Sequence, residues 1–289
     1  MLRRFHQVDV FGDTPFTGNP VAVILDGDGL ADEQMASIAQ WTNLSETTFV
    51  VPATAPGADY RVRIFTPTEE LPFAGHPTLG TCHAWLTSGG APARPGVIVQ
   101  ECPAGLVPVR SAGTRLAFAA PPLVRSGPVD DADLELVTAA MGIGPAEVVA
   151  AQWVDNGPGW VALLLDSVET VLAAQPSYTD HKVGLVALHP DGAPWAIEVR
   201  GFFPGGGQLF EDPVTGSLNA SLAQWLTSSG RLTAPYVARQ GTAIGRHGRV
   251  HVDIEEGDDG GDIWIGGATV TVVAGTIATW PTNEAPQRA

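Results

Sequence analysis

A glutamate at the start of an expected strand is the first residue of this sequence that could do chemistry. Glu46 lies in the segment 43–49 (NLSETTF), where a helical pattern ends and a β-branched run begins. A carboxylate beside an apolar strand loses solvation, which raises its pKa and suits it to carry a proton in either direction near neutral pH. Glu46 is therefore a candidate acid and base, and an exposed glutamate at a helix end is the alternative interpretation.

Two further titratable residues stand at expected helix starts. His76 lies between Gly75 and Pro77, and a histidine there can donate or accept a hydrogen bond. Asp212 directly precedes Pro213, where it could serve the reaction or cap the helix. The alternative interpretations are a core or surface histidine and an ordinary capping aspartate.

A repeated pattern links these residues to two similar structural units. The first copy reads RIFTP (63–67), then Glu69-Glu70, then AGHP (74–77) opening a helix that closes with WL (85–86). The second copy reads RGFFP (200–204), then Glu211-Asp212, then PVTGS (213–217) opening a helix that closes with WL (225–226). The repeat predicts the same strand–loop–helix unit twice, in two pseudo-equivalent domains that face each other.

The two repeated helix starts could bind an anion. The first N–H groups of a helix have no partner within it, and the helix dipole places a partial positive charge there. Gly75 and Gly216 would let a ligand approach the backbone closely, although an ordinary turn glycine is the alternative interpretation. Two such starts facing each other predict a small anionic substrate.

Short strands must position these residues. Periodicity predicts helices at about 32–42, 76–88, 133–141, 167–174 and 217–228. The β-branched and apolar runs predict more numerous strands, among them 4–11, 19–25, 46–51, 60–67, 195–203, 262–265 and 268–277. Segment 205–207 (GGG) is interpreted as a flexible loop and segment 258–262 (DDGGD) as a solvated hairpin turn.

Composition excludes several classes of protein. Of 289 residues, 15 are Lys or Arg and 31 are Asp or Glu, a net charge of −16 that repels a nucleic-acid backbone. The sequence has no apolar signal core and no run of about 18 apolar residues, so we expect no membrane span and a cytoplasmic protein. Cys82 and Cys102 form no metal or redox motif, and two reduced core thiols are expected.

The common catalytic and cofactor motifs are missing. The sequence has no Gly-x-Ser-x-Gly, His-Glu-x-x-His, phosphate-binding Gly-x-x-x-x-Gly-Lys-[Ser/Thr], or Gly-x-Gly-x-x-Gly after a strand. Segment 258–262 has too few correctly spaced oxygens for a calcium loop. These exclusions favour proton transfer without a metal or a cofactor.

Taken together, the motifs resemble the PhzF-like phenazine biosynthesis isomerases, which have the diaminopimelate epimerase fold. The resemblance covers nearly the whole chain and rests on FTGNPVAV (16–23), NLSETTFV (43–50), RIFTP (63–67), LPFAGHP (71–77), NGP (156–158), EDPVTGS (211–217), QG (240–241) and IGR (244–246). It implies an α+β fold with two pseudo-equivalent domains, each a mixed, barrel-like sheet around a central helix. It also implies a site in the cleft between the domains and a homodimer.

The expected domains are residues 1–121 and 122–269, and a C-terminal strand at about 270–289 is expected to pack onto the first. The turn-prone stretch that follows Pro121-Pro122 supports the first boundary.

The resemblance also assigns roles to residues. It implies isomerisation of trans-2,3-dihydro-3-hydroxyanthranilate, in which Glu46 takes a proton from one ring carbon and returns it to another, while His76 and Asp212 orient the substrate and help to move protons. The substrate-binding residues it implies are Gly75, Gly216, Ser217, Ser45, Asn19 and Asn156.

Fold relatives that racemise amino acids use two cysteines, one on each helix-start loop. Ala74 and Pro213 stand at those places here, and Cys82 lies inside the helix, so two-thiol racemisation is disfavoured. Two alternatives stay open. One is an isomerase of another natural-product or amino-acid-derived carboxylate, because the segment Gly205–Phe210 could change the pocket wall. The other is a non-catalytic ligand-binding protein of the same fold, against which the joint presence of Glu46, His76 and Asp212 argues.

Overall fold

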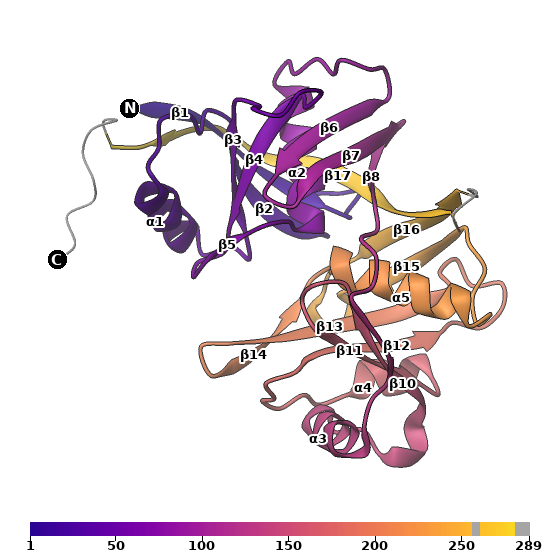
Figure 1. The fold of residues 1–289 in the computed structure, drawn as a ribbon. Coiled ribbons are helices and arrows are strands. Elements are labelled where there is room, and N and C mark those ends of the chain that lie inside the picture. Colours follow the sequence, from indigo (N-terminus) through magenta and orange to yellow (C-terminus); the bar gives the residue numbers. More distant parts are fainter. Residues whose placement is uncertain (256–260, 281–289) are drawn as a thin grey trace. The chain divides into compact units, whose positions relative to one another are not determined.

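The computed structural model describes residues 1–255 and 261–280, which form two compact units (Figure 1). Unit 1 comprises Met1–Ala119 and the chain from Gly266 onward, and unit 2 comprises Ala120–Ile265. The sequence placed these divisions at 121/122 and 269/270. The predicted turn at 258–262 and the predicted strand at about 270–289 lie partly outside the described residues.

Unit 1 is built mainly from strands. Its elements are β1 (Leu2–Val10), β2 (Asn19–Ile24), α1 (Asp32–Thr42), β3 (Thr47–Val51), β4 (Tyr60–Phe65), β5 (Glu70–Leu71), α2 (Gly75–Thr87), β6 (Val97–Cys102), β7 (Gly105–Ala112), β8 (Arg115–Ala119) and most of β17 (Asp262–Ala278). Strand pairs run from β1 through β2, β3, β4, β6, β7, β8 and β17 back to β1. The strands of unit 1 therefore close into a barrel.

Helix α2 lies inside this barrel. It contacts β1, β2, β3, β6 and β8, and its residues from Gly75 to Cys82 are all buried. Gly80 makes the fit possible, because a Cβ atom there would lie 2.3 Å from Cγ1 of Val21. Its buried hydroxyls are paired: Thr81 donates to Oγ1 of Thr48 at 2.8 Å. A helix that is apolar or internally paired on every side is typical of a barrel core.

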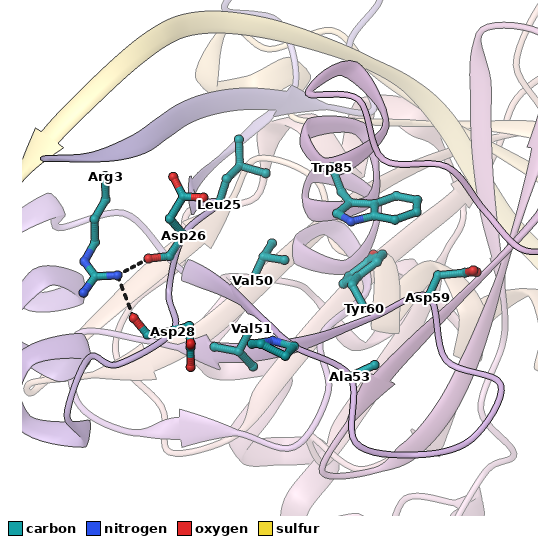
Figure 2. Close-up of a pocket in the computed structure, with 11 residues that line it drawn as sticks. Arg3, Leu25, Asp26, Asp28, Val50, Val51, Ala53, Asp59, Tyr60 and Trp85 are labelled. Atoms are coloured by element: carbon teal, nitrogen blue, oxygen red, sulfur yellow. Dashed lines mark hydrogen bonds between the residues drawn. The ribbon is translucent and has the colours of Figure 1, made fainter.

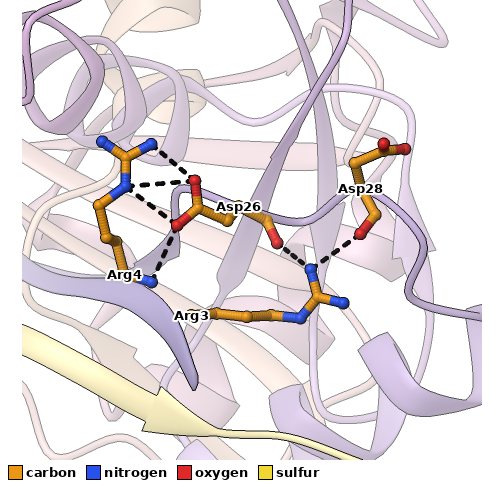
Figure 3. A network of polar contacts seen from close by, with 4 residues as sticks. All are labelled: Arg3, Arg4, Asp26 and Asp28. Atoms are coloured by element: carbon orange, nitrogen blue, oxygen red, sulfur yellow. Dashed lines mark hydrogen bonds and ion pairs between the residues drawn. The ribbon is translucent and has the colours of Figure 1, made fainter. Parts of the chain in front are cut away.

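Two consecutive arginines of β1 hold the connection from β2 to α1 (Figure 3). The Arg3 guanidinium is buried and donates to the backbone carbonyl oxygens of Asp26 and Asp28, and its Nε donates to Oγ1 of Thr279 at 3.2 Å. Arg4 binds the Asp26 carboxylate through Nε and NH2, at 2.9 and 2.6 Å, and this hydrogen bonding lowers the pKa of Asp26. These contacts tie the end of β17 and the end of β2 to β1.

Unit 2 repeats the order of unit 1. Its elements are β9 (Arg125–Pro128), α3 (Asp131–Met141), β10 (Val148–Asp155), β11 (Trp160–Leu165), α4 (Val168–Ala173), β12 (Lys182–Leu188), β13 (Ile197–Gly205), β14 (Gln208–Asp212), α5 (Gly216–Ser228), β15 (Tyr236–Gln240), β16 (Gly248–Glu255) and the first residues of β17, with one-turn helices at Pro145–Glu147 and Thr242–Ile244. Pairing of β10 to β16 matches that of β1 to β7, including parallel pairs β11–β12 and β13–β15 where unit 1 has β2–β3 and β4–β6.

Helix α5 is buried in unit 2 as α2 is in unit 1. Its buried residues include Gly216 and the stretch Leu218–Ala223. In unit 2 the glycines that allow close packing lie on the strands around α5 and not on the helix. A Cβ on Gly184 would lie 2.5 Å from Cδ1 of Leu218, and one on Gly201 would lie 2.7 Å from Oγ1 of Thr215. The structure therefore confirms an α+β fold of two similar units around buried helices.

The repeated arginine has the same role in both units. Arg63 binds Glu70 through Nε and NH2, at 2.8 and 2.6 Å, and Arg200 binds Glu211 in the same way, at 3.1 and 2.8 Å. Each pair joins neighbouring strands, β4 to β5 and β13 to β14. The structure thus gives the repeat a structural role, in which arginine holds the hairpin that leads to the buried helix.

Two sequence-based expectations were wrong in detail. The expected flexible loop at 205–207 is a tight hairpin turn between β13 and β14, in which Gly206 and Gly207 have φ of 56° and 75°. A two-residue hairpin turn of this kind requires positive φ at both central residues, which glycine adopts without strain. The strands expected at 262–265 and 268–277 are one strand, because Gly266 lets β8 approach: a Cβ there would lie 2.8 Å from the Leu116 oxygen. Within the described residues no helix is long and apolar enough to span a membrane.

Candidate active site

Three of the predicted site residues, Asn19, Glu46 and His76, lie at one end of the unit 1 barrel. Strands β2 and β3 are parallel with Ala22 opposite Thr47, so Asn19 and Glu46 lie at the same end of the pair. The backbone N–H of Ala22 donates to the Glu46 carbonyl oxygen at 3.4 Å. Helix α2 starts at this end too, and His76 is its second residue.

The side chains of Glu46 and His76 meet there. Oε2 of Glu46 lies 3.2 Å from Nε2 of His76, and Nδ1 of His76 lies 3.4 Å from Nδ2 of Asn19. The His76 side chain is 6% exposed and that of Glu46 is 15% exposed. A mostly buried carboxylate therefore faces an almost fully buried imidazole.

Burial keeps the imidazole uncharged. Desolvation lowers the pKa of His76 to about 3, against the opposing effect of a hydrogen bond with the Pro20 backbone. A neutral imidazole has one protonated nitrogen and one accepting nitrogen. Because the neutral ring carries one proton, Nε2 can donate to an ionised Glu46 in one tautomer or accept from a protonated Glu46 in the other, and the imidazole proton moves between Nε2 and Nδ1 when the tautomer changes.

This burial predicts how stability responds to acid. The folded pKa of His76, about 3, lies below the ordinary value of 6.5, so between these values the unfolded chain binds the proton more tightly. The contribution of His76 to the free energy of unfolding is therefore complete above about pH 6.5, falls as the pH falls, and levels off below about pH 3.

We expect His76→Gln to lose less stability than wild type between pH 7 and pH 4. Urea unfolding followed by circular dichroism at several pH values measures the difference. Because both proteins share every other titrating group, parallel pH curves would contradict the burial of a neutral His76.

The backbone N–H groups at the start of α2 have no side-chain cap from the N-cap residue. Its N-cap residue, Ala74, makes no side-chain capping bond, and its first turn carries no acidic residue. Helix α3 contrasts with it, since Asp130 caps α3 and Asp131 and Asp133 lie in the first turn. Gly75 is buried at the α2 start, and Ser45 is half-buried directly before Glu46.

Unit 2 has a matching arrangement at the start of α5. Thr215 is the N-cap and makes no side-chain capping bond, and the first turn carries no acidic residue. Nδ2 of Asn156 donates to the Ser217 carbonyl oxygen at 3.0 Å, and Nε1 of Trp160 donates to Oγ of Ser217 at 3.0 Å. Ser217, like His76, is the second residue of its helix and is contacted by an asparagine.

Asp212 lies at the end of β14 and is 9% exposed. Thr215 donates its hydroxyl to Oδ2 of Asp212 at 2.7 Å, and Nε2 of Gln240 donates to the Asp212 carbonyl oxygen at 3.2 Å. Asp212 is thus connected to the start of α5 by Thr215.

The structure brings Asn19, Glu46 and His76 together in unit 1, with Ser45 and Gly75 beside them in sequence. Asn156 contacts Ser217 in unit 2, next to Gly216, while Asp212 belongs to the Thr215 network. Sequence reasoning assigned no role to Trp160, Thr215 and Gln240. Thr215 and Gln240 lie in the motifs at 211–217 and 240–241. Spacing alone could not show that the buried side-chain amide of Gln240 binds Thr215.

A different hollow of unit 1 holds none of these residues (Figure 2). It has a volume of about 360 Å³, and its lining includes Arg3, Asp28, Val50, Tyr60 and Trp85. Trp85 lies nine positions after His76 in α2, roughly 13 Å further along the helix at 1.5 Å per residue. In the part of the chain that the structure describes, no group of three or more His, Cys, Asp or Glu residues could hold a metal ion.

Comparison with solved structures identifies the fold. A PhzF family phenazine biosynthesis protein from Bacillus anthracis matches with a TM-score of 0.84 at 21% identity, over 96% of this chain and 99% of the other. A hydroxyproline epimerase from Agrobacterium vitis matches with a TM-score of 0.58 at 14% identity, over 96% of this chain and 92% of the other. The fold is the diaminopimelate epimerase-like fold, which the hydroxyproline epimerase shares.

Sequence comparison identifies the family. The family model PhzC-PhzF, described as phenazine biosynthesis-like protein, matches residues 8–275. The trans-2,3-dihydro-3-hydroxyanthranilate isomerase of Pseudomonas aeruginosa is 35% identical over 88% of this chain and 91% of its own length. Antisense-enhancing sequence 1 of Schizosaccharomyces pombe is 34% identical over 94% of this chain and 97% of its own length. The chain therefore belongs to the phenazine biosynthesis-like PhzC-PhzF family, and it is an isomerase.

Proposed function

We propose that this chain moves a proton within a small cyclic carboxylate without a cofactor, and that trans-2,3-dihydro-3-hydroxyanthranilate or a close relative is its substrate. The proposal rests on the mostly buried Glu46 carboxylate, which lies 3.2 Å from Nε2 of His76. Burial lowers the pKa of His76 to about 3, so the imidazole beside this carboxylate is neutral. The identity of 35% to an isomerase named for that substrate supports the choice.

In the proposed reaction Glu46 breaks a C–H bond of the substrate by taking the proton. The electron pair left behind shifts through the adjacent unsaturated system, and Glu46 returns the proton to a different carbon. No proton is gained or lost overall, as isomerisation requires. Neutral His76 lies beside the carboxylate and donates to the anion when Nε2 carries the ring proton; to accept from the acid through the same nitrogen, the ring proton must first move to Nδ1.

The substrate carboxylate is proposed to bind at the uncapped helix starts. The N–H groups of Gly75 in unit 1, and of Gly216 and Ser217 in unit 2, belong to first turns that carry no acidic side chain. We assign Asp212 a role in orienting the substrate and moving protons, and Ser45, Asn19 and Asn156 to substrate binding.

We further propose a cytoplasmic homodimer. Cys82 and Cys102 are free and buried, which suits a reducing compartment. The chain carries no charged residue from Ile263 to Trp280, and Val273 in this stretch is 44% exposed. In a chain of net charge −16, an exposed neutral strand is a favourable place for two copies to meet, and sedimentation velocity measures whether they do.

The test of the function is turnover by the purified protein. We expect trans-2,3-dihydro-3-hydroxyanthranilate to be converted, with the change in conjugation visible by ultraviolet absorbance, when no metal or cofactor is added. A panel of other cyclic and amino-acid-derived carboxylates run in parallel separates the candidate substrates. Absence of turnover on the whole panel, with binding retained, would contradict the proposal and favour a ligand-binding protein.

A further inference from the structure

The amide of Gln240 lies at the centre of the buried network behind Asp212. Gln240 is fully buried at the end of β15 and makes four hydrogen bonds. Its Oε1 accepts from the backbone N–H of Thr215 at 3.0 Å and from Nδ2 of Asn219 at 2.8 Å. Its Nε2 donates to Oγ1 of Thr215 at 2.8 Å and to the Asp212 carbonyl oxygen at 3.2 Å. The full capacity of a primary amide is used.

The direction of this amide is determined by its partners. A backbone N–H only donates, and a backbone carbonyl only accepts. Oε1 must therefore face the N–H of Thr215, and Nε2 must face the carbonyl of Asp212. The reversed amide would set donor against donor and acceptor against acceptor inside the protein, which is costly because water cannot compensate there.

The amide in turn determines the direction of the Thr215 hydroxyl. Because Nε2 of Gln240 donates to Oγ1 of Thr215, that oxygen serves as the acceptor, and its own proton is directed to Oδ2 of Asp212 at 2.7 Å. Thr215 is 6% exposed, and a Cβ on neighbouring Gly201 would lie 2.7 Å from Oγ1, so the hydroxyl has little room to turn.

We infer that Gln240 and Thr215 are positioning residues that act through Asp212: together they fix the hydrogen bond that Oδ2 of Asp212 accepts, and so they set the proton affinity of its carboxylate. The donated hydrogen bond stabilises the ionised carboxylate and lowers its proton affinity. This assignment rests on the proposed role of Asp212 and adds to it which residues control the proton affinity of its carboxylate.

Unit 1 supplies a matched comparison. Gln100 of β6 is also fully buried, and its Nε2 donates to Oγ1 of Thr78 in α2 at 2.9 Å. Its Oε1 accepts from the Tyr60 hydroxyl at 3.0 Å. The same glutamine–threonine pair thus occurs in unit 1, where the second partner of the glutamine is a tyrosine hydroxyl. Thr78→Val should have a comparable structural cost and no effect on Asp212.

The experiment measures the pKa of Asp212 directly and needs no substrate. Protein labelled with 13C at aspartate side-chain carboxyls is titrated by NMR, and the Asp212 signal is the one that Asp212→Asn removes. The charged residues near this turn include Arg200, paired with Glu211, Arg239, paired with Glu198, Arg246, whose side chain lies beside Gly241, and Arg249 on β16; all are unchanged in the variants compared. Helix α5 carries no charged residue.

We expect Thr215→Val, which keeps the shape and removes the donor, to raise the pKa of Asp212 by about 1 unit, the size expected for one hydrogen bond to a charged group. Thr215→Ser should restore the wild-type value, and Thr78→Val should leave it unchanged. Gln240→Met is the second variant: it keeps the length of the side chain and removes the amide that fixes Oγ1 of Thr215 as an acceptor, so the pKa of Asp212 should again rise, by less than in Thr215→Val. An Asp212 pKa that is unchanged in Thr215→Val overturns the inference.

Activity provides a separate readout. On trans-2,3-dihydro-3-hydroxyanthranilate, Thr215→Val should lower kcat by about tenfold with little change in KM, and Thr215→Ser should recover it. If wild type does not turn over this compound, the proposed function fails, while the NMR titration still decides whether Thr215 and Gln240 control Asp212.

Discussion

Glu46→Gln should fold as wild type does and lose kcat by about 10²–10⁴-fold, the usual contribution of a positioned acid–base group. The substitution keeps the size of the side chain, and the backbone carbonyl that accepts from Ala22 is untouched. The amide cannot take a proton from carbon, so the shuttle is lost while binding is kept. Steady-state kinetics on trans-2,3-dihydro-3-hydroxyanthranilate measures the loss, with KM expected to change little.

Two controls sharpen this experiment. Glu46→Asp keeps the acid but withdraws it from His76 by one carbon–carbon bond, and should retain more activity than Glu46→Gln. Glu33→Gln also removes one negative charge, but Glu33 lies on the exposed first turn of α1 and is not one of the proposed site residues. This variant should keep full activity. Wild-type kcat in Glu46→Gln would contradict the assigned role of Glu46.

Asp212→Asn should give the second large loss, about 10²-fold or more in kcat. The asparagine oxygen can still accept the Thr215 hydroxyl, and the Asp212 backbone still pairs with Gly201, so unit 2 should keep its structure. What disappears is a group able to take up or release a proton at the start of α5. Thermal unfolding checks the structure, and kinetics on the same substrate gives the loss.

The matched control for Asp212 is Asp253→Asn. Asp253 is an exposed aspartate on β16 of the same unit and should be neutral in activity. If Asp212→Asn changes KM alone and leaves kcat at the wild-type value, Asp212 binds substrate without moving a proton, and its proposed catalytic role is wrong.

The sequence could predict the two similar units because the repeated residues are the ones that hold the hairpins and let the central helices be buried. Arg63 and Arg200 hold equivalent hairpins, and the small residues after Gly75 and Gly216 let α2 and α5 lie buried within their units. The helices accordingly begin and end within about two residues of the predicted positions. What periodicity could not reveal was the close approach of β8 at Gly266, which makes β17 one long strand.

The candidate site was predictable only in part, for a similar physical reason. Residue type and motif identified Glu46, His76 and Asp212, but the 3.2 Å contact of Glu46 with His76 depends on the parallel pairing of β2 with β3 and on the position of α2. The four hydrogen bonds of Gln240 join residues up to 28 positions apart. Contacts at such separations are set by the fold and leave no local pattern in the sequence.

Hydrogen exchange at the substrate ring carbons in heavy water tests whether Glu46 removes a proton from carbon, because exchange is detected even without net conversion. Wild type and Glu46→Gln are incubated with trans-2,3-dihydro-3-hydroxyanthranilate in D2O, and absorbance and deuterium content are followed together. We expect turnover by wild type, with deuterium at the ring carbons because the carboxyl proton of Glu46 exchanges with solvent before it is returned, and neither turnover nor deuteration by Glu46→Gln. Ring deuteration by Glu46→Gln at the wild-type rate would contradict the role of Glu46, because another group would then be removing the proton.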